Sequence, residues 1–162
     1  MWRYDIAEDA WSSIAMPDDY MGTDVAPSKL AAYNGSLYLM GTCKNEEGDF
    51  SDAVHLWRYD SAKNSWARVD MALPSGAAIC THKGKLFLVA GWYPEELEGL
   101  TGTHFALLDP EKRTITKVKE SDPYAIDFSE GITVVSTNSN MYCYSFGQDD
   151  PEDTAVAWQA RR

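Results

Sequence analysis

The sequence predicts an all-β protein built from repeated antiparallel sheets, and three observations support this prediction. Residues 2–5 and 57–60 both read Trp-Arg-Tyr-Asp, and a tryptophan, Trp11 or Trp66, follows each aspartate by six residues. Short runs rich in Val, Ile, Leu, Tyr and Phe recur between turn residues, which is the pattern of strands. No segment keeps an apolar period of about 3.6 residues. Residues 94–100 could form a short helical turn, but a loop is favoured.

The repeat has a period of about 50 residues. Leu37 lies 49 residues before Leu86, which lies 55 residues before Met141, and all three sit in apolar-aromatic runs that end in glycine. A weaker copy of the Tyr-Asp motif, residues 106–109, is followed at the same offset by Ile115. Self-similarity at this period predicts a propeller or a solenoid. Four hairpin-linked strands per unit favour a propeller, in which such sheets are arranged radially.

Turn residues divide each unit into strands. Residues 30–33, 77–80 and 132–135 are the expected first strands. Asn34-Gly35 predicts a two-residue hairpin, because both residues tolerate positive φ. The turns after the Tyr-Asp strands each begin with an aspartate expected to accept backbone hydrogen bonds, namely Asp5, Asp60 and Asp109.

Residues that recur at one phase are expected to be structural, since every unit solves the same packing problem. Trp11 and Trp66 should therefore pack between adjacent units, and Trp66→Ala should cost about 3–5 kcal/mol if that ring is buried. The recurring aromatics at the second strand are Tyr38, Phe87 and Tyr142. The recurring glycines Gly41, Gly91 and Gly147 suggest close backbone approach near a ring centre.

These motifs resemble the kelch repeat, which has a Gly-x-Leu-Tyr-x-x-Gly-Gly strand, a Tyr-Asp strand and a tryptophan six residues later. A Met-Pro pair often follows, as Met16-Pro17 and residues 71–74 do here. Only the second glycine of each pair is present, the third unit has Ile115 for tryptophan, and the fourth lacks Tyr-Asp. The resemblance implies one partial kelch propeller over 1–162, with the end of a blade at 1–17, blades at 28–74 and 75–123, and the start of a blade at 129–162.

About three four-stranded antiparallel blades fit into 162 residues, fewer than the about 4–8 of propellers. The ring is therefore expected to be incomplete. Three interpretations follow: a piece of a longer propeller, half of a six-bladed ring formed by a homodimer, or an open array. An unclosed ring would leave sheet faces and edges that favour association.

Composition narrows the function classes. The formal net charge of -11 argues against nucleic-acid binding and weakly favours a basic partner. Three cysteines in separate units suggest reduced, packed thiols and a cytoplasmic location. The N-terminus does not read as a signal peptide, and the longest apolar stretch, 86–92, is too short to span a membrane.

No constellation for catalysis is evident, so neither a metal, a cofactor nor an enzymatic activity is expected. The three histidines, His55, His82 and His104, have no metal-ligand spacing. The alternative is a propeller enzyme of the galactose-oxidase or sugar-epimerase kind. Residues 142–144, Tyr-Cys-Tyr, offer residue types of a copper oxidase, but they alternate between strand faces.

Function is expected in the segments that do not repeat, because binding residues concentrate on loops held by a rigid frame. Two long loops, 42–53 and 92–103, and the connection around residue 19 combine acidic and aromatic residues. The candidate protein-binding residues are Asp18, Asp19, Tyr20, Glu46, Glu47, Asp49, Phe50, Trp92, Tyr93, Glu95 and Glu96.

The kelch resemblance further implies a protein-interaction module without catalysis of its own. Such repeats occur in substrate receptors of cullin-RING ubiquitin ligases, in BTB-kelch or F-box–kelch chains, and in actin-associated proteins. The BTB-kelch type fits the motif spacing better. The recruiting domains themselves lie outside this sequence, so contact with the ligase machinery would depend on them.

Overall fold

The computed structural model describes residues 1–21, 29–44, 50–74, 76–90, 105–118, 132–145 and 158–159. All described regular elements are β-strands, and all their pairings are antiparallel, which confirms the all-β prediction. The strands are β1 (Trp2–Asp5), β2 (Ala10–Ser13), β3 (Tyr20–Met21), β4 (Leu30–Tyr33), β5 (Ser36–Lys44), β6 (Phe50–Asp60), β7 (Ser65–Leu73), β8 (Ala78–His82), β9 (Lys85–Val89), β10 (Phe105–Asp109), β11 (Thr114–Lys117), β12 (Ile132–Ser136), β13 (Met141–Ser145) and β14 (Trp158–Gln159).

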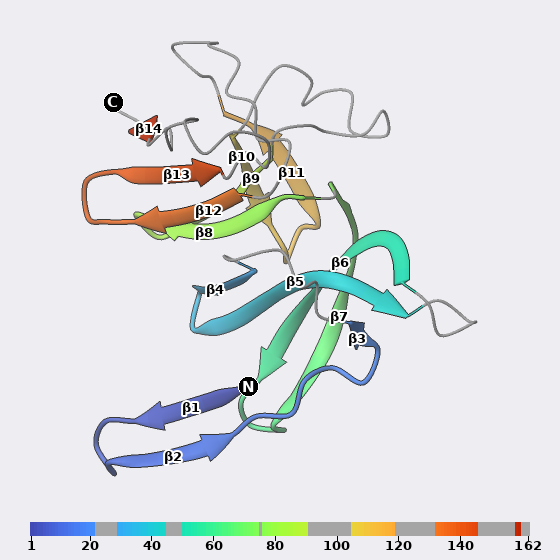
Figure 1. Cartoon of the computed structure of the whole chain (residues 1–162), viewed down its shortest axis with the longest axis vertical. Helices are drawn as coiled ribbons and strands as arrows, with labels where there is room; N and C mark the ends of the chain where they lie inside the picture. The colour runs from blue at the N-terminus through green and yellow to red at the C-terminus, as the bar shows by residue number, and fades with distance from the viewer. Residues whose placement is uncertain are drawn as a thin grey trace, which may run out of the picture.

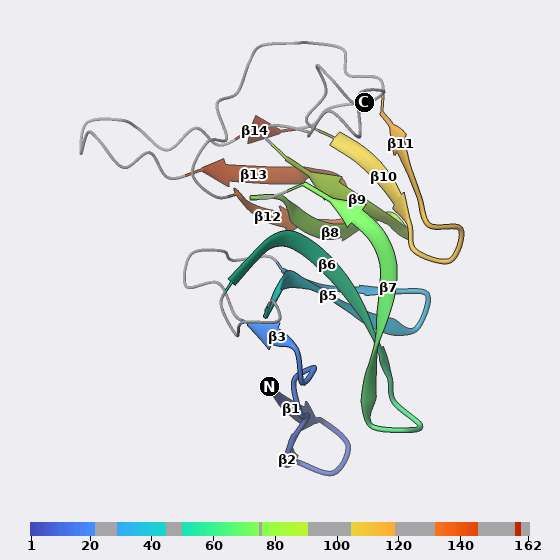
Figure 2. The ribbon, with the colours of Figure 1, turned by 90° about the vertical axis from the view of Figure 1, so that its right-hand side faces the viewer.

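The strands form a hairpin and three larger sheets (Figure 1). The N-terminal hairpin is β1–β2. Sheet 1 runs β4-β5-β6-β7. Strand β4 pairs with the first half of β5, and β3 pairs with Thr42 and Cys43 near the end of β5. Sheet 2 runs β8-β9-β10-β11, and sheet 3 runs β12-β13-β14. The sheets follow one another in chain order, with the hairpin and sheet 3 at opposite ends of the molecule (Figures 1 and 2).

The turns repeat as the sequence predicts. Asn34-Gly35 and Lys83-Gly84 both have positive φ at each turn residue, at 46° and 72° and at 48° and 71°, which matches the twist of a tight hairpin. In the second type of turn, Asp5, Asp60 and Asp109 each accept two backbone N–H bonds from the residues two and three positions later. The expected role of these aspartates is confirmed.

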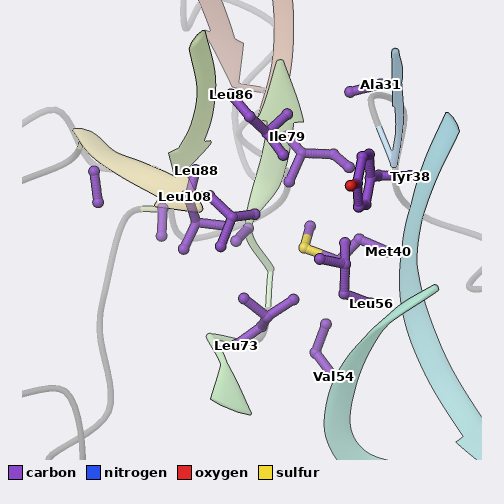
Figure 3. Close-up of a cluster of buried hydrophobic side chains, with 13 residues drawn as sticks. Ala31, Tyr38, Met40, Val54, Leu56, Leu73, Ile79, Leu86, Leu88 and Leu108 are labelled. Atoms are coloured by element: carbon purple, nitrogen blue, oxygen red, sulfur yellow. The ribbon is translucent and has the colours of Figure 1, made fainter. Parts of the chain in front are cut away.

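Sheets 1 and 2 have residues buried on both of their faces. Leu86 and Leu88 of β9 belong to a first cluster between sheets 1 and 2 (Figure 3), whereas Val89 belongs to a second cluster between sheets 2 and 3. The first cluster also contains Tyr38, Met40 and Leu56, among others, from sheet 1. Since side chains alternate along a strand, the same strand contributes to the clusters on both of its faces.

A third cluster covers the other face of sheet 1. It consists of Leu39, Cys43 and Trp57, with Met16, Tyr20 and Trp66 packed against it. Met16 and Tyr20 come from the segment that leads from the hairpin into sheet 1. This segment therefore takes the place that a neighbouring sheet takes elsewhere in the stack.

The prediction for the recurring tryptophans is wrong for Trp11, which is 68% exposed. Trp66 is only half-buried, packed on the 14–20 segment. Ile115, the corresponding residue of sheet 2, packs against the first cluster. Ile115 of sheet 2 thus faces sheet 1, and Trp66 of sheet 1 faces the 14–20 segment, which precedes that sheet in the chain. No described segment covers Trp11 on the N-terminal hairpin in the same way.

Trp57 has the structural role that the sequence analysis gave to Trp66. It is 2% exposed and packs edge-on against Tyr20, with the ring centroids 5.5 Å apart. Among the recurring second-strand aromatics, Tyr38 is buried and Phe87 packs against the second cluster, but Tyr142 is 38% exposed. The expected structural role is therefore confirmed for the first two and not for Tyr142.

Side chains link successive sheets. The Lys29 Nζ donates to the Ala77 carbonyl at 2.7 Å, and burial lowers the pKa of this amine to about 8. The Thr81 hydroxyl donates to the Ala32 carbonyl, and a ring nitrogen of His82 lies 2.9 Å from the Ser136 hydroxyl. Sheets 1 and 2, and sheets 2 and 3, are thus held by polar contacts as well as by the apolar clusters.

Two expected loops differ from the structure. Strand β5 extends to Lys44 and β6 begins at Phe50, so the loop expected over 42–53 is shorter, and its ends form a bulged strand pair. Tyr20 and Met21 form strand β3 instead of an irregular connection. The loop at 92–103, the possible turn at 94–100, His104, Gly91 and Gly147 lie outside the described residues.

Candidate binding pocket

A pocket of about 390 Å³ lies between the 14–20 segment and the β6–β7 hairpin. We call it the linker pocket. Its lining residues are Ala15, Met16, Pro17, Asp18, Asp19, Trp57, Asn64, Ser65, Trp66 and Arg68. It therefore combines indole rings, carboxylates and a guanidinium group, of which tryptophan and arginine are enriched at protein-recognition surfaces.

Hydrogen bonds fix the walls of the linker pocket. The Trp66 Nε1–H donates to the Ala15 carbonyl at 2.7 Å, and the Trp57 Nε1–H donates to Asp19 Oδ1 at 3.2 Å. Both tryptophans thus hold the 14–20 segment against sheet 1. On β6, the strand that also carries Trp57, the Tyr59 hydroxyl donates to Asn64 Oδ1 at 2.6 Å, which fixes the β6–β7 turn where Asn64 lines the pocket.

The charges of the pocket are partly neutralised. The second oxygen of Asp19 lies 4.0 Å from an Arg68 guanidinium nitrogen, in a half-exposed ion pair that contributes at most about 1 kcal/mol. Asp18 is exposed. The pocket lining thus includes one exposed carboxylate, that of Asp18, and the half-buried Trp66 ring.

Arg68 is also held by His55. The Arg68 Nη2 lies 2.7 Å from His55 Nδ1 and 3.2 Å from Nε2. Because a guanidinium group only donates, the nearer ring nitrogen accepts this bond, so the imidazole is neutral. Burial, and then the neighbouring Arg68 charge, lowers the pKa of His55. This histidine therefore acts as a neutral acceptor that orients Arg68.

A close packing contact supports the pocket from behind. A Cβ placed on Gly41 would overlap the Tyr20 ring, so the ring lies directly on the backbone of β5. The sequence predicts that another backbone segment approaches Gly41 closely near a ring centre. In the structure the group that approaches Gly41 is the Tyr20 side chain, on the face of sheet 1 that carries the third cluster. Tyr20 is therefore partly buried in the third cluster.

The structure brings together three of the predicted binding residues. Asp18 and Asp19 line the linker pocket, and Tyr20 packs directly behind it. Phe50 begins β6, where it pairs with Lys44. The remaining candidates, Glu46, Glu47, Asp49, Trp92, Tyr93, Glu95 and Glu96, lie outside the described residues.

Sequence reasoning missed Trp57, Trp66 and Arg68 as pocket residues, and His55 as the residue that holds Arg68. The sequence predicts a structural role for Trp66 and assigns none to Trp57 beyond its place in the repeated motif; both pack in the third cluster. The available signal was strand alternation: Trp57 and Tyr59 lie two residues apart on one face, and antiparallel pairing sets Trp66 opposite Tyr59 and Arg68 opposite Trp57.

The three cysteines are free and buried, as the sequence analysis predicted. Burial raises the pKa of Cys143 to about 12, so its thiol remains protonated near neutral pH. Neighbouring Tyr142 points to the opposite face of β13, where it is partly exposed. Cys143 and Tyr142 are thus divided between a core and a surface.

Within the described residues, no group of three or more His, Cys, Asp or Glu side chains could hold a metal ion. The described part of the chain likewise has no long apolar helix of the kind that crosses a lipid bilayer.

The fold and pocket define the class of protein as an all-β chain of successive antiparallel sheets with a surface pocket beside the first sheet. Comparison with protein-family models finds no match, and comparison with curated proteins finds none either.

Proposed function

We propose that the chain is part of a kelch-type β-propeller that binds another protein, and that it acts without catalysis of its own. The observation that carries this proposal is the linker pocket. Its walls are fixed by the indole bonds of Trp57 and Trp66, whereas Asp18 stands exposed at its mouth. An apolar wall and an exposed carboxylate in one pocket lining suit a basic side chain with an aliphatic stem.

Charge supports the choice of a basic partner. The formal net charge of -11 raises the rate of encounter with a positively charged segment. A lysine or arginine of the partner would place its charged group near Asp18 and its stem along the Trp66 ring. Arg68 stays paired with Asp19 and His55, which limits its repulsion of such a ligand.

A peptide array tests this binding. Purified chain is applied to peptides carrying Lys or Arg and to matched peptides with Gln in their place. We expect retention on a subset of basic peptides, weaker for Asp18→Asn and unchanged for Glu8→Gln. Glu8 is an exposed acid on the hairpin turn, so its variant has the same change in charge outside the pocket. Equal retention by both variants, or none on basic peptides, would contradict the proposal.

We further propose that the full gene product is the substrate receptor of a cullin-RING ubiquitin ligase, of the BTB-kelch type, in the cytoplasm. The support is the motif resemblance, together with the repeated antiparallel sheets and the linker pocket beside the first of them. Immunoprecipitation of the full gene product from cells tests this role. Recovery of a cullin supports it, and recovery of partners without any cullin contradicts it.

A further inference from the structure

Exposed apolar residues gather at both ends of the described stack. On the N-terminal hairpin, Trp2, Tyr4 and Trp11 are 71%, 42% and 68% exposed and share one face, which we call the front patch. On sheet 3, Val135 and Tyr142 are 57% and 38% exposed and pair across β12–β13; we call them the back patch. Exposed apolar side chains that gather on one face are a feature of interaction sites.

The residues of sheets 1 and 2 that correspond to the back patch show which part of the chain covers them. Val135 opposite Tyr142 matches two other cross-strand pairs, Ala31 opposite Tyr38 and Cys80 opposite Phe87. Ala31 and Tyr38 are buried in the first cluster, against sheet 2. Cys80 and Phe87 belong to the second cluster, against sheet 3. In both cases the next sheet of the stack covers the pair.

The residues of sheet 2 that correspond to the front patch show which surface such residues pack against. Tyr4 pairs with Trp11 as Leu108 pairs with Ile115 in sheet 2. By this register the front patch corresponds to Ala106, Leu108 and Ile115. Those three residues belong to the first cluster, which also holds Tyr38. Within this chain, the residues of sheet 2 that correspond to the front patch therefore pack in one cluster with the residues of sheet 1 that correspond to the back patch.

One copy of the chain cannot join its own two patches, because the N-terminal hairpin and sheet 3 lie at opposite ends of the molecule in both views (Figures 1 and 2). We propose that the front patch of one copy packs on the back patch of a second copy, head to tail. The contact would reproduce between molecules the packing that sheets 1 and 2 make within one. It joins two different surfaces, so it is a heterologous contact.

The chemistry of the two patches suits this contact. The front patch consists of three aromatic side chains and the back patch of a valine and a tyrosine, so apolar burial drives association. Among the described residues, the one charged group bonded to a patch residue is the Asp9 carboxylate, which accepts a hydrogen bond from the Tyr4 hydroxyl. The net charge of -11 on each copy opposes it. Added salt screens this repulsion, and association is expected to increase with ionic strength.

Complementation between two variants tests the proposal. Trp2→Asp disables the front patch and Val135→Asp disables the back patch, both at exposed strand positions. Ile6→Asp, at a residue that is 87% exposed on the hairpin turn, is the matched control outside both patches. The mass of each protein is measured by sedimentation velocity over a range of concentrations, and circular dichroism checks that each variant folds.

Wild type and Ile6→Asp should associate with increasing concentration, whereas each patch variant alone should remain monomeric. An equimolar mixture of the two patch variants should form a one-to-one complex and nothing larger, because one intact front and one intact back remain. Three results would overturn the proposal: a monomeric wild type, association of a single patch variant as strong as that of wild type, or a mixture that stays monomeric. If the wild type is monomeric, the two patches do not bind a second copy of this chain, and a different protein would have to cover them.

Discussion

Replacing Trp57 with alanine is the most direct test of how the repeated hairpins are packed, because the chain contains its own control. Trp57 and Trp2 begin identical Trp-Arg-Tyr-Asp motifs, at the end of β6 and in β1, and pair with the same register across their hairpins. Trp57 is 2% exposed and Trp2 is 71% exposed. The two variants therefore remove the same atoms from the same local structure and differ only in what surrounds them.

The expected cost follows from burial. A buried tryptophan removes roughly 150–250 Å² from water, which at about 25 cal/mol/Å² is about 4–6 kcal/mol. Measured large-to-small changes of this type cost about 3–5 kcal/mol. The hydrogen bond from the Trp57 Nε1–H to Asp19, which is also lost, is only partly buried and adds little to this cost. We expect Trp57→Ala to lower the free energy of unfolding by about 4 kcal/mol, and Trp2→Ala to change it by less than about 0.5 kcal/mol.

Urea denaturation, followed by circular dichroism at low protein concentration, measures both values. With an m-value of about 2 kcal/mol/M, the Trp57→Ala midpoint should move down by about 2 M. If that variant does not fold, Trp57→Phe keeps an aromatic ring and should cost about 1–2 kcal/mol. Equal costs at the two positions would refute the packing of the third cluster, because they would mean that the 14–20 segment does not cover Trp57.

Three other predictions concern packing and ionisation. Gly41→Ala should destabilise the protein by about 1–3 kcal/mol by displacing the Tyr20 ring, and in a Tyr20→Ala background it should cost much less; additive effects in thermal or urea unfolding would contradict the contact. Burial holds the pKa of Lys29 at about 8 in the folded state, below its ordinary 10.5, so the unfolded chain binds more protons between these values. Wild type should therefore gain stability relative to Lys29→Met, by up to about 3 kcal/mol, as pH rises from about 8 to 10.5, and a constant difference in urea midpoints would exclude the buried amine. The pKa of His55 is lowered on folding, so stability should fall as pH decreases below 6.5, where the unfolded histidine gains a proton; His55→Asn should show a smaller fall, and the same acid profile for both proteins would argue against the neutral ring beside Arg68.

The sequence predicted the fold better than the site because the fold depends on signals that repeat. The turn aspartates and the Asn34-Gly35 hairpin were predicted from local chemistry, and the structure has them in place. The exposure of Trp11 was not predictable in the same way. Its phase defines the face on which it lies, but its burial depends on whether another layer covers that face.

The linker pocket was only partly predictable for a related reason. Asp18 and Asp19 stood out as acidic residues in a segment that does not repeat. Their neighbours Trp57 and Arg68 are distant in sequence, and only the antiparallel register of β6 and β7 brings them together. Contacts between a linker and a sheet face leave no periodic pattern, so the bond between Trp57 and Asp19 could not be inferred from spacing.

The burial of sheet 2 on both faces has a consequence for the order in which the protein opens. It is the described sheet that has other sheets on either side, with the first cluster on one face and the second on the other. Local opening of a layer that has a single neighbouring sheet breaks fewer contacts than opening of a layer between two. Backbone amides in β8–β10 should therefore exchange with deuterium most slowly, and protection should decline outward in both directions.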